Sequence, residues 1–121
     1  MSARLYHICV DAHDPRALAT FWAAALGQQV LAADDDEVVV GADLHAYPGL
    51  CFLRVPDDKI VKNRLHLDLD PDDHDAEVAR LLELGARKVA IGQGPDVSWE
   101  VLADPEGNEF CVLRPHRSLI D

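Results

Sequence analysis

The chain has 121 residues, of which 49% are hydrophobic and 27% are charged, a composition typical of a single soluble globular domain. Its formal net charge of −11 argues against nucleic acid as a partner, because phosphates would be repelled over much of the surface. No apolar run approaches the roughly 20 residues of a membrane span, and the N-terminal residues lack the hydrophobic core of a signal peptide. Three cysteines without a C-x-x-C pair favour free thiols, so we expect a cytoplasmic protein.

The first half of the chain predicts a strand, a helix and three further strands. Residues 5–11 alternate at period two, which places His7, Cys9 and Asp11 on one face and Tyr6, Ile8 and Val10 on the other. Asp14 and Pro15 are suited to the start of a helix that Gly27 ends. Segments 29–32 and 37–41 flank an acidic turn and predict a hairpin, and segment 50–55 predicts the last strand of this half.

The second half repeats this series of elements. Segment 64–70 predicts a strand with Leu65, Leu67 and Leu69 on one face and His66, Asp68 and Asp70 on the other. A helix is expected over 73–84, with Gly85 as its stop, and strands are expected over 88–91, 98–102 and 109–113. Residues 104–108 have the Pro, Gly and Asn content of a turn between the last two strands.

The two halves therefore look like copies of one β-α-β-β-β unit. Gly27 follows His7 by 20 residues, and Gly85 follows His66 by 19. A repeated unit predicts paired halves around one shared site, with the two histidines as the first candidates to line it. We expect an α+β fold in one domain, with repeats over about 4–56 and 64–115.

Three groups of motifs carry a resemblance to a known superfamily. The groups are His7 with Phe21-Trp22 and Leu26-Gly27, His66 with Glu77-Val78 and Leu84-Gly85, and the turn from Asp104 to Asn108 before the last strand. Together they resemble the vicinal oxygen chelate superfamily, which includes glyoxalase I, bleomycin-binding proteins, fosfomycin-resistance thiol transferases and extradiol dioxygenases. The small glyoxalase-like domain branch is the most similar. The resemblance implies that each unit curls into half a barrel and that the two halves enclose a cleft.

The resemblance also implies four metal-ligand positions, on the first and last strand of each unit. His7 and His66 occupy the two first-strand positions. Cys111 stands where the superfamily usually has Glu, and an alignment of Gly49 with Gly107 puts Leu53 at the fourth position. A third ligand would be Glu109, after a shift of strand register, or the thiolate of Cys111, which suits zinc. The candidate ions are Zn, Mn, Ni and Fe, and the alternative is a pocket that binds no metal.

Further pocket candidates follow from strand parity and from the resemblance. Cys9 lies two residues after His7, and Asp68 lies two after His66, each on the face of its histidine. Similar thiol transferases have pocket residues at the positions of Trp99 and Val101. Trp99 would stack on a flat ligand or simply pack in the core. The three cysteines, Cys9, Cys51 and Cys111, could gather on adjacent strands, where buried cysteine more often packs than reacts.

Three functions are compatible with these residues. In the first, the cleft binds a small molecule without metal, with Cys9, Trp99, Val101 and Cys111 as pocket residues. In the second, a divalent ion activates an oxygen-bearing substrate, as in a lyase, isomerase, thiol transferase or dioxygenase, with Asp68 or Glu109 as the base. In the third, His7 or His66 acts as a general acid-base without metal.

Relatives with a single domain imply a homodimer. In an exchanged arrangement of its two halves, His7 of one chain would meet His66 of the other.

Overall fold

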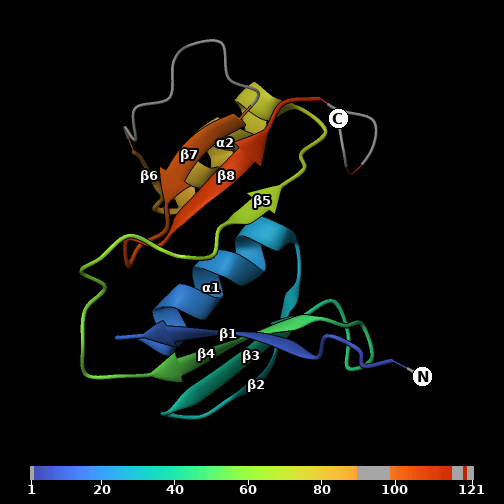
Figure 1. Ribbon diagram of the computed structural model, residues 1–121, viewed down its shortest axis with the longest axis vertical. Helices are drawn as coiled ribbons and strands as arrows, with labels where there is room; N and C mark the ends of the chain where they lie inside the picture. Colours follow the sequence, from blue (N-terminus) through green and yellow to red (C-terminus); the bar gives the residue numbers. More distant parts are fainter. Residues whose placement is uncertain (1, 90–98, 116–118, 120–121) are drawn as a thin grey trace. The chain divides into compact units, whose positions relative to one another are not determined.

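The computed structural model describes residues 2–89, 99–115 and 119, with only the backbone at position 99. The chain divides into two compact units, Met1–Lys59 and Ile60–Asp121. Within the described residues, each unit contains a four-stranded sheet and a helix (Figure 1).

The two units have the same order of elements. The first consists of β1 (His7–Ala12), α1 (Pro15–Leu26), β2 (Gln29–Ala33), β3 (Glu37–Gly41) and β4 (Gly49–Arg54). The second consists of β5 (Leu67–Leu69), α2 (His74–Leu84), β6 (Arg87–Lys88), β7 (Trp99–Ala103) and β8 (Glu109–Leu113). The strand orders are β1-β4-β3-β2 and β5-β8-β7-β6, and in each sheet the first strand is parallel to the last. This confirms the predicted α+β fold of two β-α-β-β-β units.

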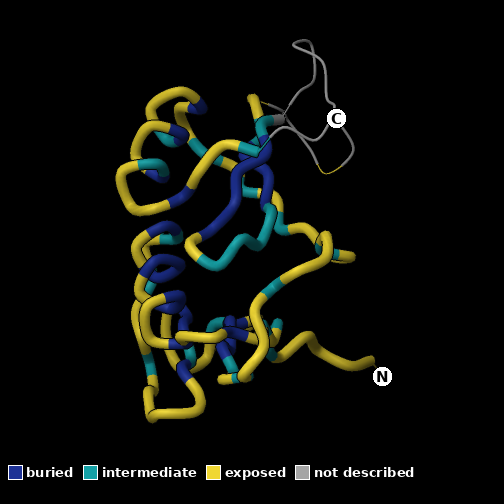
Figure 2. Tube along the Cα trace, turned by 90° about the vertical axis from the view of Figure 1, so that its left-hand side faces the viewer, coloured by how far each residue is buried: buried dark blue, intermediate teal, exposed yellow. Residues whose placement is uncertain are grey.

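In the first unit, α1 covers one face of the sheet. The helix begins where the Asp14 carboxylate accepts a hydrogen bond of 3.1 Å from the backbone N–H of Ala17, and it ends at Gly27, whose φ is 63°. Both ends match the prediction, because Asp caps orphan N–H groups and Gly adopts the left-handed conformation without a Cβ clash. Buried residues recur at helical spacing along α1, and exposed residues lie between them (Figure 2). The fully buried residues of this core include Leu18, Val40 and Phe52.

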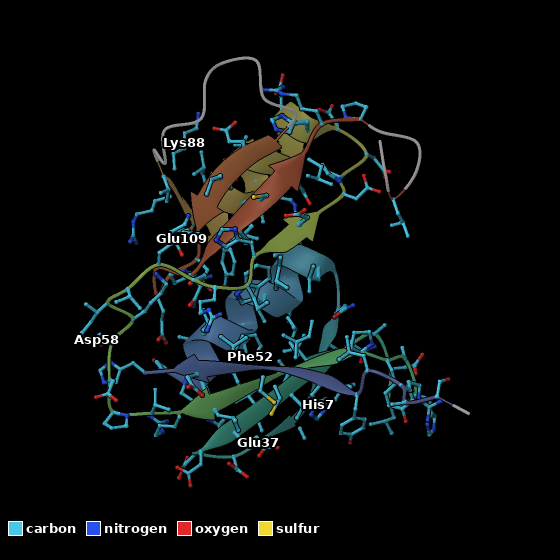
Figure 3. The ribbon with its side chains drawn as sticks, in the orientation of Figure 1. His7, Glu37, Phe52, Asp58, Lys88 and Glu109 are labelled. Atoms are coloured by element: carbon cyan, nitrogen blue, oxygen red, sulfur yellow. The ribbon has the colours of Figure 1, made fainter. Side chains whose placement is uncertain are left out.

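The face of this sheet opposite α1 carries His7, Glu37 and the two cysteines of this unit. Phe52 points toward α1, whereas His7 and Glu37 lie on the other side of the sheet (Figure 3). Cys9 lies two residues after His7 on β1 and therefore shares its face. Residues opposite each other in neighbouring strands lie on the same face, so Cys51, which pairs with Cys9, and Val39, which pairs with Cys51, share this face as well. The alternation of side chains along β1 and β4 therefore determines which of them lie on the face that α1 does not cover.

In the second unit, α2 begins where the Asp73 carboxylate accepts a hydrogen bond of 3.2 Å from the backbone N–H of Ala76. Its buried residues include Val78 and Leu81, as expected from their spacing. The turn between β7 and β8 is built around Asp104, which is completely buried. Its carboxylate accepts hydrogen bonds from the backbone N–H groups of Glu106 and Asn108 and from the Asn108 side-chain amide.

The prediction for Tyr6 is wrong. Its side chain is 61% exposed instead of lying in the apolar stripe with Ile8 and Val10. The Tyr6 carbonyl still accepts a hydrogen bond of 2.9 Å from the backbone N–H of Gly49, so the backbone pairs with β4 while the side chain leaves the apolar stripe. The Tyr6 ring instead stacks on the His7 ring, with centroids 4.1 Å apart.

The strand expected over 64–70 is shorter than predicted. Pairing with β8 begins at Leu67, which is opposite Phe110, and Leu65 is 79% exposed. The side-chain amide of Asn63 donates a hydrogen bond of 3.1 Å to the backbone carbonyl of Glu109. A side chain thus occupies a backbone acceptor at the start of β8, and His66 lies just before the strand instead of within it.

The strand expected over 88–91 ends at Lys88 within the described residues, and residues 90 and 91 lie outside them.

Candidate functional site

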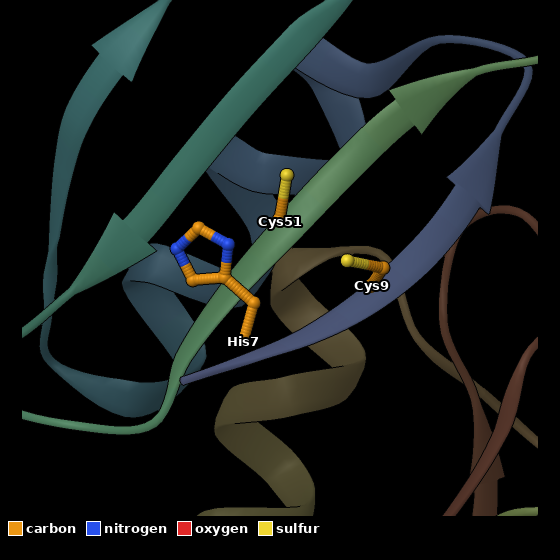
Figure 4. A group of neighbouring side chains, drawn as sticks. All are labelled: His7, Cys9 and Cys51. Carbon is orange, nitrogen blue, oxygen red and sulfur yellow. The ribbon is translucent and has the colours of Figure 1, made fainter. Parts of the chain in front are cut away.

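Three donor side chains gather on the open face of the first sheet. His7 and Cys9 come from β1 and Cys51 comes from β4 (Figure 4). One donor atom from each, an imidazole nitrogen and two sulfurs, lies within 4.8 Å of the other two. In Figure 4 the Cys9 thiol points from β1 toward β4, and the His7 ring lies over β4 beside Cys51. The parallel register that pairs Cys9 with Cys51 is what brings the two sulfurs together.

The position of the His7 ring depends on two neighbours. Gly49 is the register partner of His7, and a Cβ there would lie 3.5 Å from His7 Cδ2 and 3.0 Å from the Val40 carbonyl oxygen. The absence of a side chain at Gly49 therefore leaves room for the imidazole over β4. The Tyr6 ring is stacked on the imidazole at an interplanar angle of 29°. The imidazole is thus confined by an aromatic ring and a backbone without a side chain.

The Cys51 thiol is held in its protonated form. Burial is the main reason that its pKa rises from 9.0 to about 11, and the neighbouring Glu37 carboxylate and Cys9 thiol add to the effect. Cys51 is only 3% exposed, whereas Cys9 is exposed to solvent. A thiolate at Cys51 would need a cation to offset its burial and the Glu37 charge.

The second unit has a similar pair at the equivalent place. Asp68 on β5 is the register partner of Cys111 on β8, and Cys111 is the register partner of Val101 on β7. Burial, followed by the Asp68 carboxylate, raises the pKa of the Cys111 thiol to about 11, while Lys62 partly opposes this. Val101 and Cys111 are both buried, at 2% and 8% exposure. Asp68 and Cys111 thus correspond to Cys9 and Cys51.

This correspondence corrects the assignment of Leu53. Leu53 pairs with Asp11, whereas Cys51 pairs with Cys9 as Cys111 pairs with Asp68. The alignment of Gly49 with Gly107 is therefore off by two residues, and Cys51 rather than Leu53 is the residue equivalent to Cys111. The spacing of the chain carried this signal, since 59 residues separate His7 from His66 and 60 separate Cys51 from Cys111. The gathering of the three cysteines is correct for Cys9 and Cys51, whereas Cys111 belongs to the other sheet.

The remaining site candidates lie in the second unit. His66 is exposed just before β5, and Glu109 is half-buried at the start of β8. The Glu109 carboxylate accepts a hydrogen bond of 3.4 Å from the backbone N–H of Asn63. Trp99 begins β7, and its side chain lies outside the described residues. The expectation that His7 and His66 line one chamber stays a prediction, as does the role of Glu109 as a ligand or base.

The donor set of the first unit fits a metal ion of intermediate softness. Two sulfurs and one imidazole nitrogen are ligands that zinc accepts, and three protein ligands leave one position open. Among the residues that the structure describes, this is the only such group of three or more His, Cys, Asp or Glu side chains. The set differs from the predicted triad of His7, His66 and Glu109 or Cys111, because all three donors belong to one unit.

Comparison with known families bears on the whole chain. Residues 7–113 match the family model described as a glyoxalase-like domain. The match begins at His7 and ends with β8, so it includes both repeats. No curated protein matches the sequence. No helix among the described residues is long and apolar enough to cross a membrane.

Solved structures share the fold at low sequence identity. A glyoxalase/bleomycin resistance/dioxygenase family enzyme from Burkholderia phytofirmans PsJN matches with a TM-score of 0.72 and 19% identity, covering 93% of this chain and 98% of that chain. The bleomycin-binding protein of Streptomyces verticillus, complexed with copper(II)-bleomycin, matches with 0.61 and 18%, covering 96% and 99%. TnmS3, an antibiotic binding protein from Streptomyces sp. CB03234, matches with 0.65 and 23%, covering 95% and 98%.

Proposed function

The chain belongs to the glyoxalase-like domain family, and on that premise we propose that it binds one small molecule in a cleft to which both repeats contribute. The observation that carries the proposal is the internal equivalence of the two sheets. Each has a buried thiol on its last strand beside a polar residue on its first strand, Cys51 with Cys9 and Cys111 with Asp68. Apolar neighbours such as Val101 accompany them. A largely apolar surface with a few polar anchors is typical of small-molecule sites.

The charge of the chain narrows the ligand class. A net charge of −11 attracts cations and repels anions over much of the surface. Both buried thiols have a pKa of about 11, so at pH 7 they are neutral and neither attract nor repel a charged ligand. We therefore propose a neutral or cationic ligand. Relatives of the same fold are named as binders of bleomycin and of an antibiotic, which supports trying such compounds first.

Isothermal titration calorimetry with metal-free bleomycin, copper(II)-bleomycin and a set of cationic, neutral and anionic aromatic compounds tests this proposal. We expect a cationic or neutral compound to bind, and added salt to weaken a cationic one. His7→Ala and Asp68→Ala, one change in each repeat, should each weaken binding about tenfold, which corresponds to about 1.4 kcal/mol. Arg16→Ala on the exposed side of α1 is the matched control. Binding by anions alone, or equal affinity in all three variants, would contradict the proposal.

A metal-dependent enzyme is the second candidate, favoured by the position of His7 among metal-ligating side chains. Its ligand set is the one that the resemblance implies, not the cluster of His7, Cys9 and Cys51. Here His7 and His66, with Glu109 or Cys111, would hold Zn, Mn, Ni or Fe, and Asp68 or Glu109 would move a proton on an oxygen-bearing substrate. Metal analysis of untagged protein tests this. Stoichiometric metal that disappears in both His7→Ala and His66→Ala is the expected result, and protein that takes up no divalent ion contradicts it.

The two repeats that form the proposed cleft would belong to one chain or, in an exchanged arrangement, to the two chains of a homodimer. We propose that the protein is cytoplasmic. Mixing the His7→Ala and His66→Ala variants distinguishes these arrangements. Exchange creates one intact site in each mixed dimer, so ligand binding would partly recover on mixing. No recovery, together with a monomer by light scattering, contradicts the dimer.

A further inference from the structure

We propose that the first unit by itself binds one zinc ion, through the thiolates of Cys9 and Cys51 and the imidazole of His7. This site differs from the metal arrangement considered above, because it needs no residue of the second unit. It uses His7, Cys9 and Cys51, which the proposed small-molecule site also includes, so zinc binding and compound binding are measured separately. The proposal rests on the one cluster of sulfur and nitrogen donors that the described part of the chain contains.

The distances suit a small closure around an ion. Zinc binds sulfur at about 2.3 Å and imidazole nitrogen at about 2.0 Å, so tetrahedral ligand atoms lie roughly 3.4–3.8 Å apart. The three donor atoms here already lie within 4.8 Å of one another. Cys9 and Cys51 are fixed opposite each other by the backbone register of β1 and β4. Rotation about the Cα–Cβ bonds, mainly of exposed Cys9, supplies the remaining approach.

The surroundings of the cluster also favour an ion. The Tyr6 ring and the bare backbone of Gly49 confine the His7 imidazole. The Glu37 carboxylate lies beside the Cys51 thiol. When zinc binds, both thiols lose their protons to solvent and the two thiolates neutralise the charge of the ion, so no oxidant or reductant is needed. Because Cys9 is exposed, the ion enters from solvent, and water fills the fourth position.

The second unit explains why one site is expected rather than two. Asp68 stands where the first unit has Cys9, so the equivalent set has one sulfur instead of two. Two thiolates select zinc over harder ions such as Mn²⁺ and Mg²⁺, which prefer oxygen ligands. The difference between Cys9 and Asp68 thus makes the proposed site specific to the first unit.

The experiment uses the full, untagged chain, reduced and freed of metal. Zinc is titrated in competition with a chromophoric chelator, and Co²⁺ is substituted for zinc so that thiolate ligation appears as a charge-transfer absorption in the near ultraviolet. We expect one ion per chain, bound with release of two thiol protons. Cys9→Ser, Cys51→Ser and His7→Ala should each weaken zinc binding at least tenfold. Cys111→Ser and His66→Ala, the matched changes in the second unit, should leave zinc affinity and the cobalt spectrum unchanged.

Two results overturn the proposal. Folded wild-type protein that binds no zinc would exclude the site, and equal losses in His66→Ala and His7→Ala would show an ion shared between the units. Cys9→Asp, which copies the second unit, guards against a folding artefact because position 9 is exposed. Circular dichroism should match that of the wild type, while the thiolate-to-cobalt absorption falls by about half. Compound binding measured with a chelator present separates failure of this site from failure of the proposed function.

Discussion

Raising the pH should destabilise this protein through its two buried thiols. In the folded state, Cys51 and Cys111 both have a pKa of about 11, against 9.0 for an ordinary thiol. The folded chain therefore holds these protons more tightly than the unfolded chain does. Their contribution to stability is complete below pH 9 and is lost as the pH rises from 9 through 11.

The size of the effect follows from the two pKa values. At pH 10 about nine-tenths of each thiol is ionised in the unfolded chain, but only about one-tenth in the folded chain. Each thiol then costs about 1.4 kcal/mol of the free energy of unfolding, so the pair costs about 3 kcal/mol. That is a large part of the roughly 5–15 kcal/mol that stabilises a typical domain.

Urea denaturation at pH 8 and pH 10, with reductant and a chelator present, measures this loss. The matched control is the double variant Cys51→Ala and Cys111→Ala, which is less stable at pH 8 but lacks both groups. Lysines and tyrosines titrate alike in both proteins, so the difference between the two pH-dependent losses isolates the thiols. We expect the wild type to lose about 3 kcal/mol more than the double variant. Equal losses would show that the folded thiols titrate near pH 9 and would refute the reasoning.

Three further predictions rest on single side chains. At pH 8 a chromogenic disulfide reagent should label one thiol per chain rapidly, because Cys9 is the only exposed cysteine. The Cys9→Ser variant should lose this rapid phase, and rapid labelling of all three cysteines would contradict the prediction. Asp104→Ala should lower the free energy of unfolding by about 3 kcal/mol, because it leaves the donors of Glu106 and Asn108 without their acceptor, and a loss under 1 kcal/mol in urea denaturation would oppose this. Asp14→Ala should cost about 1 kcal/mol by removing the cap of α1, and an unchanged urea midpoint would argue against that role.

Much of the fold could be read from local patterns. The Asp14 and Asp73 carboxylates set the helix starts by accepting hydrogen bonds from nearby backbone N–H groups, and Gly27 and Gly85 set the stops by adopting a positive φ. Both devices are local, so the sequence alone specified them. Strand 109–113 was predicted to the residue. Strand 64–70 was not, because Asn63 occupies a carbonyl of Glu109 through a contact between residues 46 positions apart.

The candidate site was only half determined in this way. The sequence identified His7 and the position of Cys9 relative to it, because alternation along one strand is a local property. Only the tertiary structure decided that Cys51, rather than Leu53, faces Cys9, since cross-strand register depends on pairing between segments about 40 residues apart. The donor cluster exists because β1 and β4 pair in parallel in that register, and a shift of one residue would turn the Cys51 thiol to the face covered by α1.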